Sequence, residues 1–303
     1  MKYRSFPFQL VTLYFFFGLL MIVSCTRENS LTNTDAQEEQ VSSVSGESSA
    51  EAENIFSETF DDVMGVNNEV GIAGSGVFYG RPDTLNPTAR CFTVTITHPN
   101  NSPFPAHVVI DFGTSGCMGP DGHIRKGKII SDYTNRLIYP GAMATTTFDG
   151  YYIDSIHVEG VHKISNISSG TASKVFKVEV INGKLTKPSG NFIEWNSLNT
   201  ITQVEGLTTP GDPRDDIFKI TGSAKGFVKR GNLLVRWEST ITEPLIRRFT
   251  CRWIVKGRIR TMRLNLPNPN NSPWVAVLDF GNGGCDNQAT ITINGITHQI
   301  TLP

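Results

Sequence analysis

The chain has 303 residues, of which 39% are hydrophobic and 18% are charged, and its formal net charge is −1. Such a length and composition describe a soluble globular protein with one large or two ordinary domains. Charge is segregated, because residues 26–53 carry seven acids and Arg27 as the one base, whereas residues 54–303 are weakly basic. A weakly basic body without a concentrated basic face gives no support to nucleic-acid binding.

The first 25 residues have the pattern of an export signal. Lys2 and Arg4 precede an apolar run, Leu10 to Val23, which is shorter than the bilayer span of about 20 residues. The run leads into Ile22-Val23-Ser24-Cys25, which resembles the lipobox of bacterial lipoproteins. The resemblance implies a signal peptide over 1–24 and a Cys25 that becomes the acylated, membrane-tethered N-terminus. The alternatives are an uncleaved anchor or an ordinary secretory signal.

Residues 25–53 are predicted to be the lipidated cysteine followed by a disordered acidic tether, since they contain no aromatic residue and few aliphatic ones. Acids soon after the lipidated cysteine also resemble surface-export signals of Bacteroidota lipoproteins. The expected location is therefore the cell envelope, at the periplasmic or the outer surface of the outer membrane. Disulfides persist in such a compartment.

The body over 54–303 begins with a short amphipathic helix and continues as strands. Ile55, Phe56, Phe60, Val63 and Met64 recur at helical spacing and predict a helix that docks on the body. From residue 71 onward, alternating strands separated by turns such as Asn182-Gly183 and Asn294-Gly295 predict an all-β protein. We expect an antiparallel β-sandwich, either one extended sandwich or two packed ones with a boundary near 207–214.

One motif occurs twice, at 111–117 and 279–285, as Asp-Phe-Gly, two variable residues, Gly and Cys. A Pro-Asn-Asn-Ser-Pro-aromatic loop precedes each copy, and a further cysteine lies upstream, Cys91 in the first case and Cys251 in the second. If each copy is a hairpin centred on its loop, Cys91 lies opposite Cys117 and Cys251 lies opposite Cys285. We therefore expect two local disulfides, in preference to a four-thiolate zinc site, which usually contains Cys-x-x-Cys.

The residues that invite a catalytic interpretation have simpler explanations. Asp111 and Asp279 are each followed by a glycine turn, which an aspartate side chain commonly caps. Histidines occur without metal-ligand spacing, and the sequence contains no nucleophile elbow, phosphate loop or dinucleotide fingerprint. No catalytic residue, metal or cofactor is assigned, and we lean toward a protein that is not an enzyme.

Two surface features remain as candidates for binding. Lys256, Arg258 and Arg260 alternate along one strand, near other arginines including Arg247 and Arg263, and either form a solvated face with cross-strand acids or meet a phosphate or acidic glycan. Phe104 and Trp274 occupy equivalent positions in the two loops and are the best ligand-contacting pair.

The motifs of residues 55–303 resemble those of Bacteroidota envelope lipoproteins to which no activity is attached. They comprise the paired Asp-Phe-Gly-x-x-Gly-Cys hairpins, Thr146 to Tyr152, Val-Glu-Gly at 158–160 and 204–206, and Cys-Asp-Asn-x-Ala-Thr at 285–290. The expected function is a non-catalytic, lipid-anchored binding or structural module, glycan-binding or adhesive, whose partners are the bilayer through Cys25 and a glycan or envelope protein. The alternatives are an envelope hydrolase that uses strand-end carboxylates and a scaffold in outer-membrane assembly.

Overall fold

The computed structural model describes residues 33–64, 91–119, 122–170, 174–209, 215–265 and 274–302. The predicted signal peptide over 1–24 and the predicted lipidation site Cys25 lie outside the described residues. The chain divides into two units, Met1–Gln37 and Glu38–Pro303, and the architecture that follows is that of the second unit.

Within these described residues, one helix precedes a single antiparallel sheet of 14 strands. The helix α1 is Asn33–Met64. The strands are β1 (Thr93–Thr97), β2 (Ala106–Asp111), β3 (Cys117–Met118), β4 (Ile124–Tyr133), β5 (Met143–Ile153), β6 (Ile156–Asn166), β7 (Val175–Thr186), β8 (Phe192–Glu205), β9 (Ile217–Arg230), β10 (Leu233–Arg248), β11 (Ile254–Arg263), β12 (Val275–Asn282), β13 (Gln288–Ile293) and β14 (Ile296–Thr301). They pair in chain order from β1 to β14, except that β3 pairs only with β4 at the side of this path.

The predicted all-β class with an N-terminal helix is confirmed. The layers differ from those of a sandwich, because one continuous sheet takes the place of two packed sheets and α1 covers its inner face. β8 and β9, on either side of the predicted boundary near 207–214, pair along almost their whole length, so the described strands form one sheet across it. Consecutive hairpins add each strand to the edge of the last, so the sheet extends as a meander.

The sheet bends around the helix at β-bulges, which twist and bend the strands that carry them. Register shifts occur between Lys126 and Lys128 in β4, and between Val180 and Gly183 in β7. Gly127 has a φ of 74°, and a Cβ at this position would lie 1.9 Å from the carbonyl oxygen of Gly150 on β5. The Asn182-Gly183 pair, which we predicted to be a turn, is instead the bulge inside β7.

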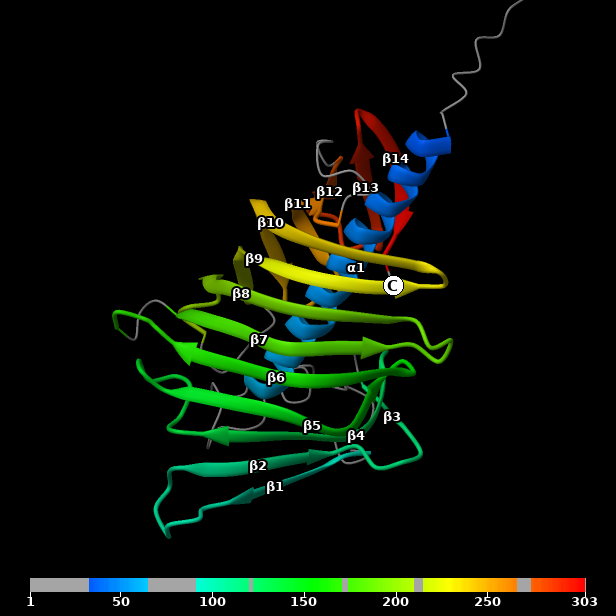
Figure 1. Ribbon diagram of the computed structural model, residues 1–303. Helices are drawn as coiled ribbons and strands as arrows, with labels where there is room; N and C mark the ends of the chain where they lie inside the picture. Colours follow the sequence, from blue (N-terminus) through cyan, green and yellow to red (C-terminus); the bar gives the residue numbers. More distant parts are fainter. Residues whose placement is uncertain are drawn as a thin grey trace, which may run out of the picture. The chain divides into compact units, whose positions relative to one another are not determined.

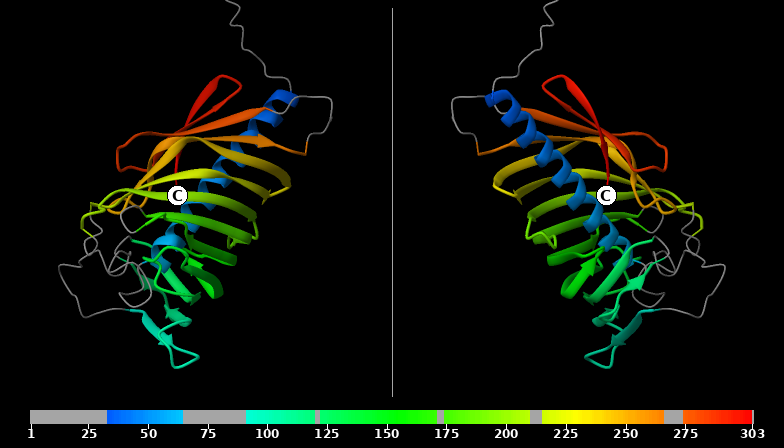
Figure 2. Two further views of the ribbon diagram at one scale, coloured as in Figure 1. Left: turned by 90° about the vertical axis from the view of Figure 1, so that its left-hand side faces the viewer. Right: turned by 90° about the vertical axis from the view of Figure 1, so that its right-hand side faces the viewer.

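Residues 38–64 of α1 run diagonally across the inner face of the sheet, from β14 to β4 (Figures 1 and 2). From Val41 to Met64, all residues except Ser43, Glu47 and Asn54 are buried. The Phe56 ring stacks on Trp195 of β8 at a centroid distance of 5.3 Å. Gly183 permits this approach, because a Cβ there would lie 2.8 Å from the Phe56 ring. The helix therefore forms the centre of the hydrophobic core.

The predicted disordered tether is wrong for residues 33–53, which belong to this helix. The predicted short helix is real but begins far earlier than the apolar spacing indicated. Local apolar content alone does not decide the order of this segment, because the folded state makes two further contributions. Small side chains such as Ala52 and Gly46 let the backbone approach the sheet, and distant cations neutralise the acids.

Candidate binding site

Both predicted disulfides are present, Cys91–Cys117 with a Cα–Cα distance of 5.4 Å and Cys251–Cys285 with 5.8 Å. Cys91 lies two residues before β1, and Cys251 lies between β10 and β11. Each bridge closes a loop of about 30 residues and removes conformational entropy from the unfolded chain. The two copies of the repeated motif are thus similar structural units near the two ends of the sheet.

The two aspartates of the repeat cap turns, as predicted. The Gly113 amide donates to Asp111 Oδ1 and the Gly281 amide donates to Asp279 Oδ1, each at 2.8 Å. Asp279 also accepts from Arg258 Nε at 2.7 Å, and these hydrogen bonds, opposed by partial burial, leave the pKa of its carboxyl lowered. Asp111 and Asp279 lie on β2 and β12, which the strand order separates widely. A shared carboxylate site is therefore not formed.

The basic strand β11 presents Lys256, Arg258 and Arg260 on its exposed face. Arg258 pairs across the sheet with Glu243 on β10 and Asp279 on β12, at 2.6 and 2.7 Å. The interpretation as a solvated face with cross-strand acids is thus supported at Arg258. Arg247 and Arg263 do not join this face, because both are buried and pair with acids of α1.

The main electrostatic feature is the pairing of α1 with the inner face of the sheet. Residues 33–64 contain nine acids and no lysine or arginine. The sheet supplies partners along the length of the helix: Glu38 with Arg263, Glu39 with His298, Glu47 with Arg230, Glu51 with Lys187, Glu58 with His123 and Arg125, Asp61 with Arg247, and Asp62 with Arg125. An isolated helix with this composition would repel itself, so its order depends on the sheet.

The most deeply buried part of this network surrounds Arg125 on β4, whose side chain is fully buried. Its guanidinium lies 3.6 Å from Glu58 and 3.4 Å from Asp62, both on the last turns of α1. His123 contacts Glu58 at 3.0 Å through Nε2 and Asp154 through Nδ1. Burial raises the pKa of the neighbouring Tyr151 well above its usual value, which keeps its hydroxyl neutral. The cluster fastens the end of α1 to β4.

Glu53 on α1 is paired with the neutral amide of Asn199. Both of its carboxylate oxygens accept from Asn199 Nδ2, at 2.9 and 3.1 Å. Burial raises the pKa of Glu53 to about 7, although the hydrogen bonds from Asn199 and Ser57 and the charge of Arg247 oppose the shift. Glu53 therefore changes protonation near neutral pH.

The structure does not bring Phe104 and Trp274 together. Phe104 lies two residues before β2, in the β1–β2 loop, and Trp274 directly precedes β12. Both side chains are partly buried against the hydrophobic core. Of the loops they border, residues 266–273 lie outside the described residues. The predicted ligand-contacting role of Phe104 and Trp274 stays a prediction.

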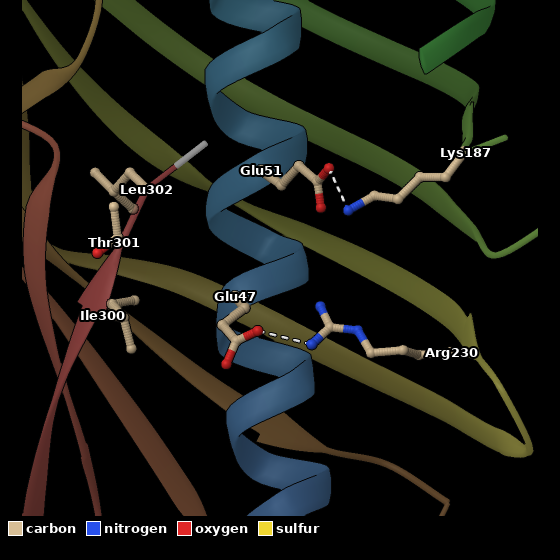
Figure 3. A pocket seen from close by; sticks show the side chains of 7 residues that line it. All are labelled: Glu47, Glu51, Lys187, Arg230, Ile300, Thr301 and Leu302. Atoms are coloured by element: carbon tan, nitrogen blue, oxygen red, sulfur yellow. Dashed lines mark hydrogen bonds and ion pairs between the residues drawn. The ribbon is translucent and has the colours of Figure 1, made fainter. Parts of the chain in front are cut away.

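A recess of about 380 Å³ lies instead between α1, the ends of two hairpins and the last strand. Its lining residues are Glu47, Glu51, Lys187, Arg230, Ile300, Thr301 and Leu302. Figure 3 shows the two glutamates on α1, with Lys187 and Arg230 on one side and residues 300–302, at the end of β14, on the other. Each ion pair has an N–O distance of 2.7 Å. One wall is thus charged but paired, and the other is aliphatic. We call this recess, together with the outer edge of β14, the β14 site.

The edge of β14 is open along the recess. The Leu302 amide donates to Asn287 O, and Ile293 pairs with Ile296 across the Asn294-Gly295 turn, so even-numbered residues of β14 bond to β13. By the alternation of an antiparallel pair, the amides and carbonyls of Thr297, Gln299 and Thr301 point away from β13. β14 ends the strand order, so no strand among the described residues meets them.

Sequence reasoning missed the β14 site, although two signals for it were present. The acids of 35–62 occur without a base, which requires cations elsewhere in the fold. The segment Ile296–Thr301 is a β-branched strand without lysine, proline or bulge, the devices that usually protect a sheet edge.

Within the described ranges, no group of His, Cys, Asp and Glu side chains is arranged to hold a metal ion. None of the helices described is long and apolar enough to cross a membrane. Comparison with protein-family models, with curated proteins and with solved structures finds no match to this chain.

Proposed function

We propose that this protein is an envelope lipoprotein anchored through Cys25, that its body is a non-catalytic binding module, and that it binds an extended polypeptide at the β14 site. The open edge of β14 carries the proposal. Thr297, Gln299 and Thr301 offer backbone donors and acceptors to a further strand. Strand addition gives affinity through the main chain and selectivity through recesses for alternate side chains.

The recess supplies the second part of such recognition. A strand added to β14 directs every other side chain toward the inner face of the sheet, where Ile300 and Leu302 line the recess. Beyond them lie the ion pairs of Glu47 and Glu51, whose charges are already matched. An uncharged strand rich in β-branched residues fits this surface better than a strongly charged ligand does. A glycan site at Phe104 and Trp274 has no comparable support.

Anchoring is tested by radiolabelled palmitate in growing cells. We expect label in the wild-type protein and none in Cys25→Ser, which should also leave the membrane fraction. The control is a second substitution in the same segment, Ser24→Ala, which preserves a small residue before the cysteine and should retain the label. Label that persists in Cys25→Ser would contradict the lipid anchor.

Binding at the β14 site is tested by a photo-crosslinking amino acid at Thr301 in intact cells. We expect a crosslinked adduct with an envelope polypeptide and none from the same probe at Leu198, an exposed position on the outer face of β8. The Gln299→Pro substitution should abolish the Thr301 adduct, because proline removes the outward amide that an added strand needs. A Thr301 probe that captures nothing, or an adduct that survives Gln299→Pro, would contradict the binding site.

A further inference from the structure

The open edge of β14 is self-complementary. Its outward residues, Thr297, Gln299 and Thr301, are evenly spaced about Gln299. When two such edges meet antiparallel with Gln299 on the two-fold axis, Gln299 exchanges both hydrogen bonds with its own counterpart. Thr297 then lies opposite the partner's Thr301, and Thr301 lies opposite the partner's Thr297. Every outward backbone group of these three residues is paired in this one register.

The side chains favour the same register. Thr297, Gln299 and Thr301 are all exposed, and threonines that face each other across strands are a favourable pair. On the inner face, Ile296 is 49% exposed, although it is a large aliphatic residue at a strand end. In this register it lies opposite the partner's Leu302. The contact would cover Ile296 and extend the aliphatic wall that Ile300 and Leu302 form beside the recess.

Charge does not oppose the approach. β14 contains no acid, lysine or arginine, and its one titratable side chain, His298, points inward to Glu39 at 2.9 Å. The nearby acids Glu47 and Glu51 are each paired with a cation. Uncharged, straight, unprotected edge strands pair with other chains, and an isologous contact closes after two copies.

We therefore infer that the polypeptide bound at the β14 site is β14 of a second copy of this chain, so that two sheets join edge to edge in a two-fold dimer. This inference rests on the proposed function for the location of the site, and it adds the identity of the partner. The inference concerns β14 rather than β1, the strand at the other end of the described strand order, because β1 is shorter and does not line the recess.

Cysteine crosslinking of the full-length protein in its own membrane tests the dimer. In the inferred register, Gln299→Cys places its thiol directly opposite the partner's Cys at the same position, so mild oxidation should give a covalent species of twice the chain mass. Thr95→Cys, at an exposed position on β1, is the matched control and should remain monomeric. Failure of Gln299→Cys to crosslink, or equal crosslinking by Thr95→Cys, would overturn the inference, as would species larger than a dimer.

A second pair of variants separates loss of the dimer from loss of folding. The Gln299 amide makes no bond to β13, so Gln299→Pro and Gln299→Lys should keep the wild-type circular dichroism spectrum and a cooperative thermal transition. Each should shift the purified protein from dimer to monomer in light scattering, the first by removing a donor and the second by like-charge repulsion on the axis. The Thr301 probe could instead capture a protein whose mass differs from that of this chain, with the purified protein monomeric in light scattering. That result would refute the dimer while leaving the proposed function intact. A Thr301 probe that captures nothing would refute both.

Discussion

Substitution of Arg125 by leucine is expected to lower the free energy of unfolding by about 3–5 kcal/mol, the largest single effect we predict. The Arg125 side chain is fully buried between Glu58 and Asp62, which are themselves almost completely buried. Leucine fills much of the space of the arginine side chain. The carboxylates of Glu58 and Asp62, which water solvates poorly, then lack this cation. Removal of one partner of a buried ion pair costs far more than the pair contributes over an apolar replacement. The measurement is a urea titration followed by fluorescence.

Arg258→Leu is the matched control, since Arg258 also bridges two carboxylates on neighbouring elements but its side chain is 46% exposed. Water and salt screen those charges, so Arg258→Leu should cost much less stability than Arg125→Leu. Adding Asp62→Asn to Arg125→Leu should restore part of the lost stability, because it removes one of the uncompensated charges. Similar losses for Arg125→Leu and Arg258→Leu would show that burial does not determine the strength of these contacts.

Substitution of Glu53 by glutamine is expected to stabilise the protein above neutral pH and to have little effect in acid. Burial raises the pKa of Glu53 from 4.5 to about 7 in the folded state. Below pH 4.5 the carboxyl is protonated in both the folded and unfolded chains, so folding carries no ionisation penalty. Between pH 4.5 and 7 the unfolded chain ionises first, so stability falls as pH rises. Above pH 7 the penalty is constant, at most about 3 kcal/mol.

Glutamine has the shape of the protonated acid and retains an oxygen that can accept from Asn199 Nδ2. We therefore expect Glu53→Gln to raise the free energy of unfolding by about 1–3 kcal/mol at pH 8, with little difference from the wild type at pH 4.5. Glu47→Gln, which removes a half-buried charge from the pair with Arg230, should instead lower stability slightly at pH 8. A Glu53→Gln variant that is less stable at pH 8 than the wild type would mean that Glu53 is stabilising as an anion.

Features that depend on a few neighbouring residues were predictable from the sequence. Strand alternation predicted the β-rich body, and Asn294-Gly295 predicted the last hairpin. Hairpin symmetry predicted both disulfides. Cys91 and Cys117 flank the antiparallel pair β1–β2, and Cys251 and Cys285 flank the antiparallel pair β11–β12. The capping roles of Asp111 and Asp279 also followed from their own glycine turns.

Features that depend on distant residues were not predictable in the same way. Asn182-Gly183 has a turn composition, but β6 and β8 continue on both sides and make it a bulge. The lining of the β14 site comes from α1, two hairpins and the last strand, so no local motif contains it. Arg247 and Arg263 point inward because their side of the strand faces α1. The pattern of charges along the sequence does not predict which side of a strand faces the helix.

The sequence by itself determined the strand-forming body, the local disulfides and the turn-capping aspartates, because periodicity, turn chemistry and loop closure act over short stretches of chain. Only the tertiary structure decided that residues 33–53 are helical, with burial from Val41 onward, and that the strands form one sheet around this helix. The physical reason is the distance along the chain between interacting charges. Glu38 and Arg263 are 225 residues apart, and Glu47 and Arg230 are 183 apart. An acidic, serine-rich segment is ordered only when the sheet supplies its cations and its apolar contacts together.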